Sequence, residues 1–298
     1  MKTTEIIQLA SSKGLDVLED SIKINDSGID FLVAHAREQN GEKWILRIPR
    51  RPESMRNARQ EKEALEIIGR NTSFQVPRWS VFSEELIAYK QLSGVPAGII
   101  DLEKQCYIWS LDEKNLPSEY YSSLGKVLAE LHSLAQDEFR IIKMEILGSD
   151  ELRASMKRRM ERVKEKYQIN PGLWERWQAW LAEDSLWPAH VGVKHGDLHP
   201  GHILINRHNY VTGLIDWTEI GISDVSVDFT AHFLLFGEDG LKRLLNEYDN
   251  AGGKTWTKMP EHIAELATTT GITVAEYAQV SGLKEMHDTA TYLLALDQ

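Results

Sequence analysis

The sequence contains little cysteine and no long hydrophobic stretch, and both scarcities exclude classes of protein. Its 298 residues include one cysteine, Cys106, so the chain cannot form an internal disulfide, which agrees with a reducing compartment. We interpret Cys106 as a small residue of the core. The longest apolar runs, such as residues 233–236, are far shorter than the roughly 20 residues that cross a bilayer, and the N-terminus lacks a basic segment followed by an apolar one. We therefore expect a cytoplasmic protein with no membrane partner.

Basic residues are also outnumbered. The chain has 34 Lys and Arg against 45 Asp and Glu, a net charge of −11. Because nucleic-acid backbones are held chiefly by Lys and Arg, we expect no nucleic-acid partner, whereas a cationic ligand would suit this balance. The one basic run, residues 157–166, is interleaved with glutamates at helical spacing and indicates a solvated helix face. With 42% hydrophobic and 27% charged residues, the chain has the composition of a globular protein.

The order of the periodic segments predicts two parts of different character. The predicted strands of the first third are residues 29–36, 44–48 and 86–92, and its one strong helix is 55–68. A connector follows at 93–98. Beyond it the pattern is mainly helical, with clear helices at 120–134 and 173–181 and one short hairpin formed by 202–205 and 211–215. We therefore predict an α+β fold with a β-rich first lobe, a connector and a mainly helical second lobe.

The segment His-Gly-Asp-Leu-His-Pro-Gly-His at residues 195–202 carries the clearest chemical signal. Asp197 lies in a loop whose glycine and proline content excludes regular structure, and Asp216 ends an apolar strand where a hydrophobic residue would be expected. Such a pair of carboxylates suits metal-assisted phosphoryl transfer, in which one acid orients the attacking hydroxyl and another holds Mg²⁺ on the phosphates.

Two opposite charges in the first lobe are predicted to face each other. Alternation along residues 44–48 places Arg47 on the same face as Ile45, and helical spacing places Glu61 in a stripe with apolar neighbours. An unpaired buried charge costs several kcal/mol, so we predict that Arg47 and Glu61 pair. The alternative is that Arg47 extends along the surface to solvent.

His195, Asp197, His202 and Asp216, followed by Trp217, resemble the catalytic and metal segments of the aminoglycoside phosphotransferase and protein-kinase-like superfamily. Kinases usually carry Asn at the position of His202, whereas the macrolide 2′-phosphotransferases have His there. Further segments with sequence similar to that family are residues 27–31, 44–51, 85–98, 173–181 and 212–219, so the resemblance spans nearly the whole chain. It implies a two-lobed protein-kinase-like fold.

The resemblance also implies roles for residues of the second lobe, 94–298. By this likeness Asp197 is the catalytic base, His195 braces the loop at 195–202, and His202 and Asp216 hold Mg²⁺, with Mn²⁺ as an accepted substitute. Asp228 resembles the aspartate that braces the catalytic loop of kinases, although an exposed acid at a helix start would also account for it.

For the first lobe, residues 1–93 with a hinge near 89–93, the resemblance implies a nucleotide-binding role. Arg47 and Glu61 take the place of the Lys and Glu pair of kinases, with Arg able to contact phosphate oxygens as well. Ser27 and Gly28 belong to a loop that covers the phosphates. The list of expected nucleotide-binding residues is completed by Lys90 and Leu92, whose main-chain groups would meet the purine.

The expected reaction is transfer of the γ-phosphate of GTP or ATP to the 2′-hydroxyl of a macrolide amino sugar, by a monomer. Another hydroxyl acceptor, such as an aminoglycoside, is the nearest alternative. A zinc hydrolase using His195, Asp197, His199 and His202 and a non-catalytic nucleotide-binding module are more remote ones. An aromatic stripe of Trp174, Trp177, Trp180 and Trp187 is predicted to be helix-pair core more than ligand wall.

Overall fold

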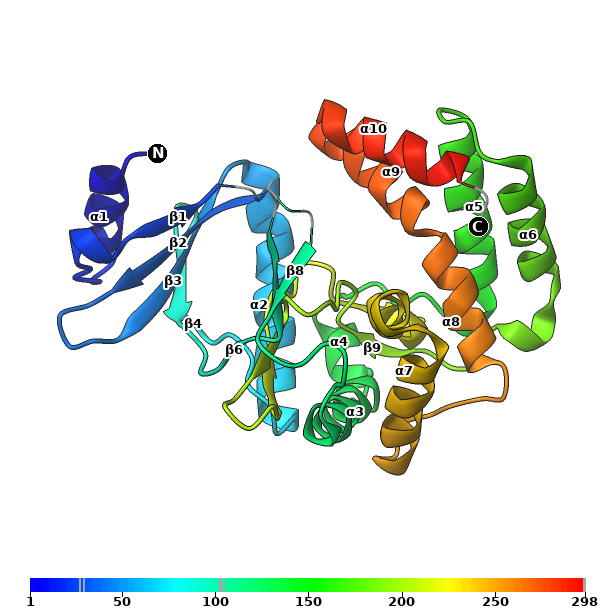
Figure 1. The fold of residues 1–298 in the computed structure, drawn as a ribbon. Helices are drawn as coiled ribbons and strands as arrows, with labels where there is room; N and C mark the ends of the chain where they lie inside the picture. The colour runs from blue at the N-terminus through cyan, green and yellow to red at the C-terminus, as the bar shows by residue number, and fades with distance from the viewer. Residues whose placement is uncertain (27, 29, 102–103, 105, 297–298) are drawn as a thin grey trace.

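The protein has two lobes, and the computed structural model describes all residues except 27, 29, 102–103, 105 and 297–298 (Figure 1). The N-terminal lobe is an antiparallel sheet of five strands in the order β1-β2-β3-β5-β4. Its strands are β1 (Lys23–Asn25), β2 (Phe31–Arg37), β3 (Lys43–Pro49), β4 (Trp79–Phe82) and β5 (Ile87–Lys90), and its helices are α1 (Thr3–Ser12), η1 (Glu19–Ser21) and α2 (Pro52–Asn71). The predicted strands and helix are therefore present, with bounds that differ by a few residues.

The two faces of this sheet bury different sets of side chains, as alternation along β3 predicts. Leu46 belongs to a cluster with Ile6 of α1, whereas Ile45 belongs to a cluster with Ala58 of α2. Arg47 shares the second face, so its guanidinium is directed toward α2. The strand period thus sets which residues of β3 can reach the helix.

The connector joins the N-terminal lobe to a small sheet in the other lobe. β6 (Val95–Pro96) pairs with β10 (Ile203–Ile205), which pairs in turn with β11 (Val211–Leu214). The predicted hairpin is confirmed, and the connector adds a strand to it that periodicity did not predict. The segment after α2 is attached to the same hairpin, because the Gln75 N–H donates to the Thr212 carbonyl at 2.9 Å and the Gln75 carbonyl accepts from the Leu214 N–H at 3.0 Å.

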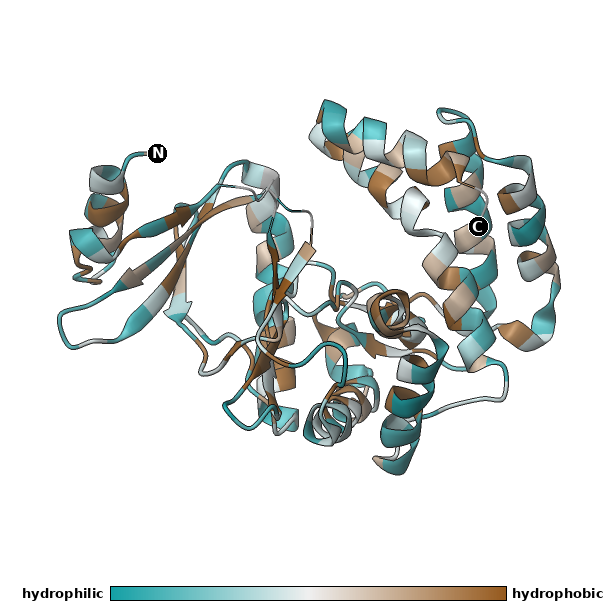
Figure 2. Cartoon of the chain, in the orientation of Figure 1, coloured by the Kyte–Doolittle hydropathy of each residue, from teal (hydrophilic) through white to brown (hydrophobic). Residues whose placement is uncertain are grey.

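The C-terminal part is mainly helical, and its helices are banded in hydropathy, as expected when one face of each is buried (Figure 2). α3 (Ser118–His132) packs against α7 (Thr230–Asn250). The other elements are α4 (Asp137–Ile141), α5 (Ser149–Lys164), α6 (Pro171–Ala182), η2 (Asp184–Leu186), β9 (Gly192–Lys194), β12 (Gly221–Ser223), η3 (Val225–Phe229), α8 (Met259–Thr268), α9 (Thr270–Ser281) and α10 (Lys284–Ala295). None of the helices that the structure describes is long and apolar enough to cross a membrane.

The tryptophan stripe is largely core, as predicted. Trp177 and Trp180 of α6 are buried in a cluster that also includes residues of α5, α9 and α10. Their indole N–H groups donate within the core, from Trp177 to Thr268 at 2.8 Å and from Trp180 to His262 at 3.2 Å. Since a buried indole N–H needs an acceptor, these contacts favour a structural role for the stripe.

Cys106 is not a core residue, and that expectation is wrong. It lies at the start of β8 (Cys106–Trp109), which pairs with β7 (Gly98–Asp101) in a separate sheet of two strands. Cys106 is exposed, and so are the paired residues Ile99 and Ile108, each at 56%. A sheet of two strands buries less of its surface than a larger one, so residue type alone did not reveal the exposure.

Candidate active site

The loop at residues 195–202 lies between β9 and β10, and a buried carboxylate fixes its start. Asp228 of η3 is 2% exposed and accepts the backbone N–H groups of His195 and Gly196, both at 2.8 Å. It also accepts from Nε2 of His132 at 3.1 Å. Burial works to raise the pKa of Asp228, but the hydrogen bond and charge of His132 and the other donors outweigh it and lower the pKa. The expectation that Asp228 braces this loop therefore matches the geometry, and the exposed-acid alternative does not.

Gly196 allows the close approach that this arrangement needs. Its φ is +93°, a conformation that favours glycine, and a Cβ there would come within 2.1 Å of the Glu219 carbonyl oxygen. The next residue, Asp197, is exposed, with its carboxylate free to meet a ligand.

His195 is buried inside the loop and links it to the strand that ends at Asp216. Its Nε2 donates to the Ile215 carbonyl at 2.9 Å, and its Nδ1 accepts the Asp197 N–H at 3.4 Å. Burial lowers the pKa of His195 to about 4, so the ring is neutral. Because both ring nitrogens are occupied, His195 has the bracing geometry expected of it and is not available to a metal.

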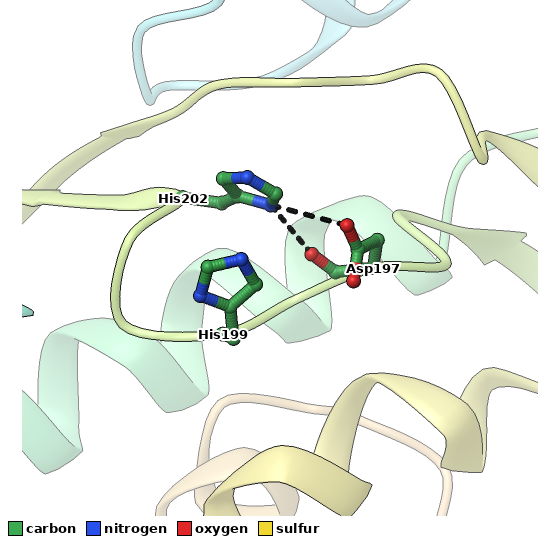
Figure 3. Close-up of side chains that lie close together, drawn as sticks. All are labelled: Asp197, His199 and His202. Atoms are coloured by element: carbon green, nitrogen blue, oxygen red, sulfur yellow. Dashed lines mark hydrogen bonds and ion pairs between the residues drawn. The ribbon is translucent and has the colours of Figure 1, made fainter. Parts of the chain in front are cut away.

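His202 lies between the two carboxylates. Its Nδ1 donates to the Asp197 main-chain carbonyl at 2.7 Å and is 3.7 Å from the Asp197 carboxylate (Figure 3). Its Nε2 is 3.6 Å from Oδ2 of Asp216, which follows β11 with a φ of +61°. Burial works to raise the pKa of Asp216, but His202 and Arg47 outweigh it and lower the pKa.

This donor set fits a divalent cation. The hydrogen bond at Nδ1 fixes the tautomer of the neutral ring, which then has its lone pair on Nε2, the state that a metal ligand requires. Metal–ligand bonds of about 2.1 Å at 90–120° place two ligand atoms roughly 3–3.6 Å apart, which the spacing of Nε2 and Oδ2 matches. One imidazole and one carboxylate suit Mg²⁺, and they suit Mn²⁺ better, because it accepts nitrogen ligands more readily.

The predicted pair in the N-terminal lobe is present. Both Arg47 and Glu61 are buried, and their two hydrogen bonds measure 2.7 and 3.2 Å. The Arg47 guanidinium also lies over the Phe31 ring at 4.4 Å. Burial works to lower the pKa of Arg47, but Glu61 outweighs it, and Asp216 of the other lobe contributes in the same direction, so the pKa of Arg47 is raised. The alternative of an Arg47 that reaches solvent does not match the structure.

The loop expected to cover phosphates is tied to the start of α2. Ser27 lies outside the described residues, and Gly28 is exposed, with space so limited that a Cβ would approach the Phe31 carbonyl oxygen to 2.7 Å. Asp30 accepts from Arg51 at 2.7 Å and from the Ser54 hydroxyl at 2.8 Å. Sequence reasoning missed Asp30, Arg51 and Ser54, although two arginines at 50–51 directly before the Pro52 helix start were a possible signal.

The hinge begins at the end of β5 and is bonded to the neighbouring strand β3 through Gln91. The Gln91 N–H donates to the Lys43 carbonyl at 2.8 Å. In an extended chain the main-chain groups of successive residues point to opposite sides, so those of Lys90, the last residue of β5, are turned away from β3, and Leu92 lies beyond the end of β5. The Lys90 side chain itself forms an exposed ion pair with Glu42.

His199, considered from the sequence only as a ligand of the alternative zinc centre, and Tyr107, which had no role assigned from the sequence, also meet this site. Potential ligand atoms of Asp197, His199 and His202 lie within 4.8 Å of one another. The Tyr107 hydroxyl of β8 is 3.3 Å from Nδ1 of His199. Burial and then His202 lower the pKa of His199 to about 4. The four-ligand zinc centre considered above loses His195 but keeps these three residues together.

The two lobes, the exposed loop carboxylate beside a strand-end carboxylate, and the buried Arg–Glu pair define a kinase-like phosphotransferase. Residues 21–262 match the phosphotransferase enzyme family (APH), and the chain belongs to that family. The resemblance is thereby confirmed at the level of this family.

Three similar proteins cover nearly the whole chain. The uncharacterized protein YcbJ of Bacillus subtilis (strain 168) is 40% identical over 275 residues, 92% of this chain and 90% of that protein. A solved structure named macrolide 2′-phosphotransferase type I is 33% identical with a TM-score of 0.92, covering 99% of this chain and 97% of its own. The apoenzyme of macrolide 2′-phosphotransferase MphH from Brachybacterium faecium is 29% identical with a TM-score of 0.89, covering 99% and 98%.

We predict that Glu61→Gln lowers the free energy of unfolding by about 3–5 kcal/mol, because the buried Arg47 loses its charged partner. Urea denaturation at neutral pH measures this. The matched control is Glu66→Gln on the same helix, which removes an exposed ion pair with Lys62 and should cost less than about 1 kcal/mol. Equal losses in the two variants would contradict a buried pair that stabilises the lobe.

A second prediction concerns acid stability. The pKa of His195 falls from 6.5 in the unfolded chain to about 4 in the folded protein. Between these values the unfolded chain binds the extra proton, so stability is lost as pH falls from 6.5 toward 4, by up to about 3 kcal/mol. His195→Gln should therefore show a shallower loss over this window in denaturant titrations.

The control for that measurement is His232→Gln, because burial also lowers the pKa of His232 to about 4, outside the 195–202 loop. His232→Gln should likewise reduce the loss of unfolding free energy between pH 6.5 and pH 4, while leaving phosphoryl transfer unchanged. If the unfolding free energy of His195→Gln fell with pH as steeply as that of wild type, the His195 ring would not be held neutral.

Proposed function

We propose that the chain transfers the γ-phosphate of GTP or ATP to the 2′-hydroxyl of the amino sugar of a macrolide. The observation that carries the transfer chemistry is His202 between the Asp197 and Asp216 carboxylates, at 3.7 and 3.6 Å. The likeness over nearly their full length to two solved macrolide 2′-phosphotransferases supports the choice of acceptor.

In this proposal Asp197 accepts the proton of the acceptor hydroxyl as its oxygen attacks phosphorus. Its exposure leaves it open to the acceptor, and the main chain beside it is held by His195, Asp228 and His202. Preorganising a base in this way avoids reorganisation during the reaction. Asp216 and His202 would hold Mg²⁺ or Mn²⁺, which when bound neutralises charge on the phosphates.

The N-terminal lobe, taken as residues 1–93, holds the nucleotide. Arg47 remains positively charged and lies within electrostatic reach of Asp216, so it can contact a phosphate while bonded to Glu61. Gly28 permits close approach of the chain to the phosphates, together with the neighbouring Ser27. The main-chain groups of Lys90 and Leu92 meet the purine.

The second lobe, residues 94–298, supplies the acceptor surface. A macrolactone needs an apolar wall, and α7 and α9 expose Leu234 at 58% and Val280 at 66%. The pKa of Tyr277 on α9 is raised by burial and then by the charge of Asp30, the residue that bonds Arg51 and Ser54 at the start of α2. The net charge of −11 favours an acceptor that carries an ammonium group beside the reactive hydroxyl.

The direct test is incubation of the purified protein with GTP or ATP and Mg²⁺, offering macrolides and aminoglycosides in parallel. We expect one phosphoryl group added to macrolides by mass spectrometry, with the 2′ position identified by NMR. GTP should be used at least as well as ATP in competition at equal concentrations. Transfer confined to aminoglycosides would overturn the acceptor while leaving the family activity intact.

Asp197→Asn should lower kcat by about 10²- to 10⁴-fold, because the amide keeps the shape but loses the basicity. Nucleotide and macrolide affinities by titration calorimetry should stay within roughly tenfold of wild type. Asp20→Asn, an exposed residue of η1, is the control and should leave kcat unchanged. Near wild-type kcat in Asp197→Asn would exclude Asp197 as the base.

A further inference from the structure

Two neighbouring histidines of the 195–202 loop are held in opposite tautomers by the main chain. Their ring centroids are 3.9 Å apart. His202 donates from Nδ1 to the Asp197 carbonyl at 2.7 Å, so the neutral ring has its free lone pair on Nε2, 3.6 Å from Asp216. That is the form in which an imidazole binds a cation.

His199 is arranged in the other way. Its Nδ1 accepts the backbone N–H of Gly201 at 3.1 Å. A backbone N–H can only donate, so Nδ1 carries no proton, and the neutral ring must carry its proton on Nε2. The Tyr107 hydroxyl, 3.3 Å from the same Nδ1, adds a second contact on that side.

The protonated nitrogen of His199 is turned toward the reacting groups. Figure 3 shows one ring nitrogen of His199 directed toward the space between His202 and Asp197 and the other directed away. The nitrogen directed away is bonded to the ring carbon that joins the side chain, which identifies it as Nδ1. No acceptor among the described residues bonds Nε2. An N–H group at this place repels a cation and attracts an anionic oxygen, so His199 is not suited to be a third metal ligand.

We propose that His199 is a catalytic residue whose Nε2–H donates a hydrogen bond to a non-bridging oxygen of the phosphoryl group during transfer. The proposal rests on the phosphotransferase activity and not on the identity of the acceptor. The bond from phosphorus to the nucleoside diphosphate breaks with its electron pair leaving on the diphosphate. The bond from phosphorus to the acceptor oxygen forms, and the hydroxyl proton passes to Asp197. His199 keeps its proton throughout.

The position of His199 beside the path of the transferred phosphoryl group explains why its N–H group would act as a hydrogen-bond donor. The transferred group passes between a hydroxyl at Asp197 and phosphates held near Asp216 and His202, and potential ligand atoms of His199, Asp197 and His202 lie within 4.8 Å of one another. Charge is spread over the non-bridging oxygens in the transition state, and a fixed donor there needs no reorganisation.

The first arm of the test needs no acceptor. Histidine-labelled protein is examined by long-range proton–nitrogen NMR, with His199→Gln and His202→Asn used to assign the two rings. We expect Nε2–H at His199 and Nδ1–H at His202. Electron paramagnetic resonance then measures Mn²⁺ affinity, which should stay within about threefold in His199→Ala and fall about 10- to 100-fold in His202→Ala.

The second arm measures rates with whichever hydroxyl the wild type phosphorylates, or with water as acceptor. His199→Ala and His199→Asn should lose about 10²- to 10³-fold in kcat, as for removal of one transition-state donor. His199→Gln, whose amide nitrogen reaches the Nε2 position, should recover to within about tenfold of wild type. Thermal unfolding confirms that each variant is folded.

Several results would overturn the proposal. Nδ1–H at His199, or a loss of Mn²⁺ affinity in His199→Ala equal to that in His202→Ala, would make His199 a metal ligand instead. A His199→Gln rate as low as that of His199→Ala, or a wild-type rate in His199→Ala, would exclude a donor role. If the protein failed to phosphorylate macrolides but transferred phosphate to another acceptor, both arms of the test could still be carried out and interpreted.

Discussion

The carboxylate of Asp228 holds two backbone N–H groups at the start of a loop that has no regular secondary structure of its own. The positions of Asp197 and His202 follow from this contact. It fixes His195 and Gly196, and from there the chain brings Asp197 to the surface and returns His202 beside it. A buried ion is costly unless it is fully hydrogen-bonded, and here His132 completes the set, with its other nitrogen bonded to Tyr248 at 3.0 Å. The hydrogen bonds thus extend from the loop into α3 and α7, which are the packed core of this lobe.

The two lobes interact electrostatically as well as by packing. Arg47 is bonded to Glu61 within the N-terminal lobe, yet its charge also acts on Asp216 of the other lobe, and Asp216 acts on Arg47 in return. A nucleotide phosphate and a cation inserted between them would each find a partner of opposite sign. The resulting site is assembled from both lobes, and the paired charges hold its two sides ready without a ligand.

The sequence predicted correctly those features that follow from the period of a strand or helix, or from the free-energy cost of burying an unpaired charge. Strand and helix periods place Arg47 and Glu61 on facing surfaces, and the cost of an unpaired buried charge then requires their contact. Other features depend on which main-chain atom lies nearby, and residue types do not reveal that. The strand pairing of Val95 and Pro96, the exposure of Cys106 and the opposite tautomers of His199 and His202 are of this kind. The proposed acceptor surface combines α7 and α9, whose relative placement no local pattern encodes.

The N-terminal lobe is attached to the β10–β11 hairpin at two separate points, Gln75 after α2 and Val95 after the hinge. Two fixed points leave a rigid body a single axis of rotation. Any opening of the lobes that keeps these main-chain hydrogen bonds would be a swing about the line through the two attachments, whereas sliding or twisting would break them. A swing about that line would keep Arg47 on one fixed arc relative to Asp216, so the two attachments would make the approach of the two charges repeatable.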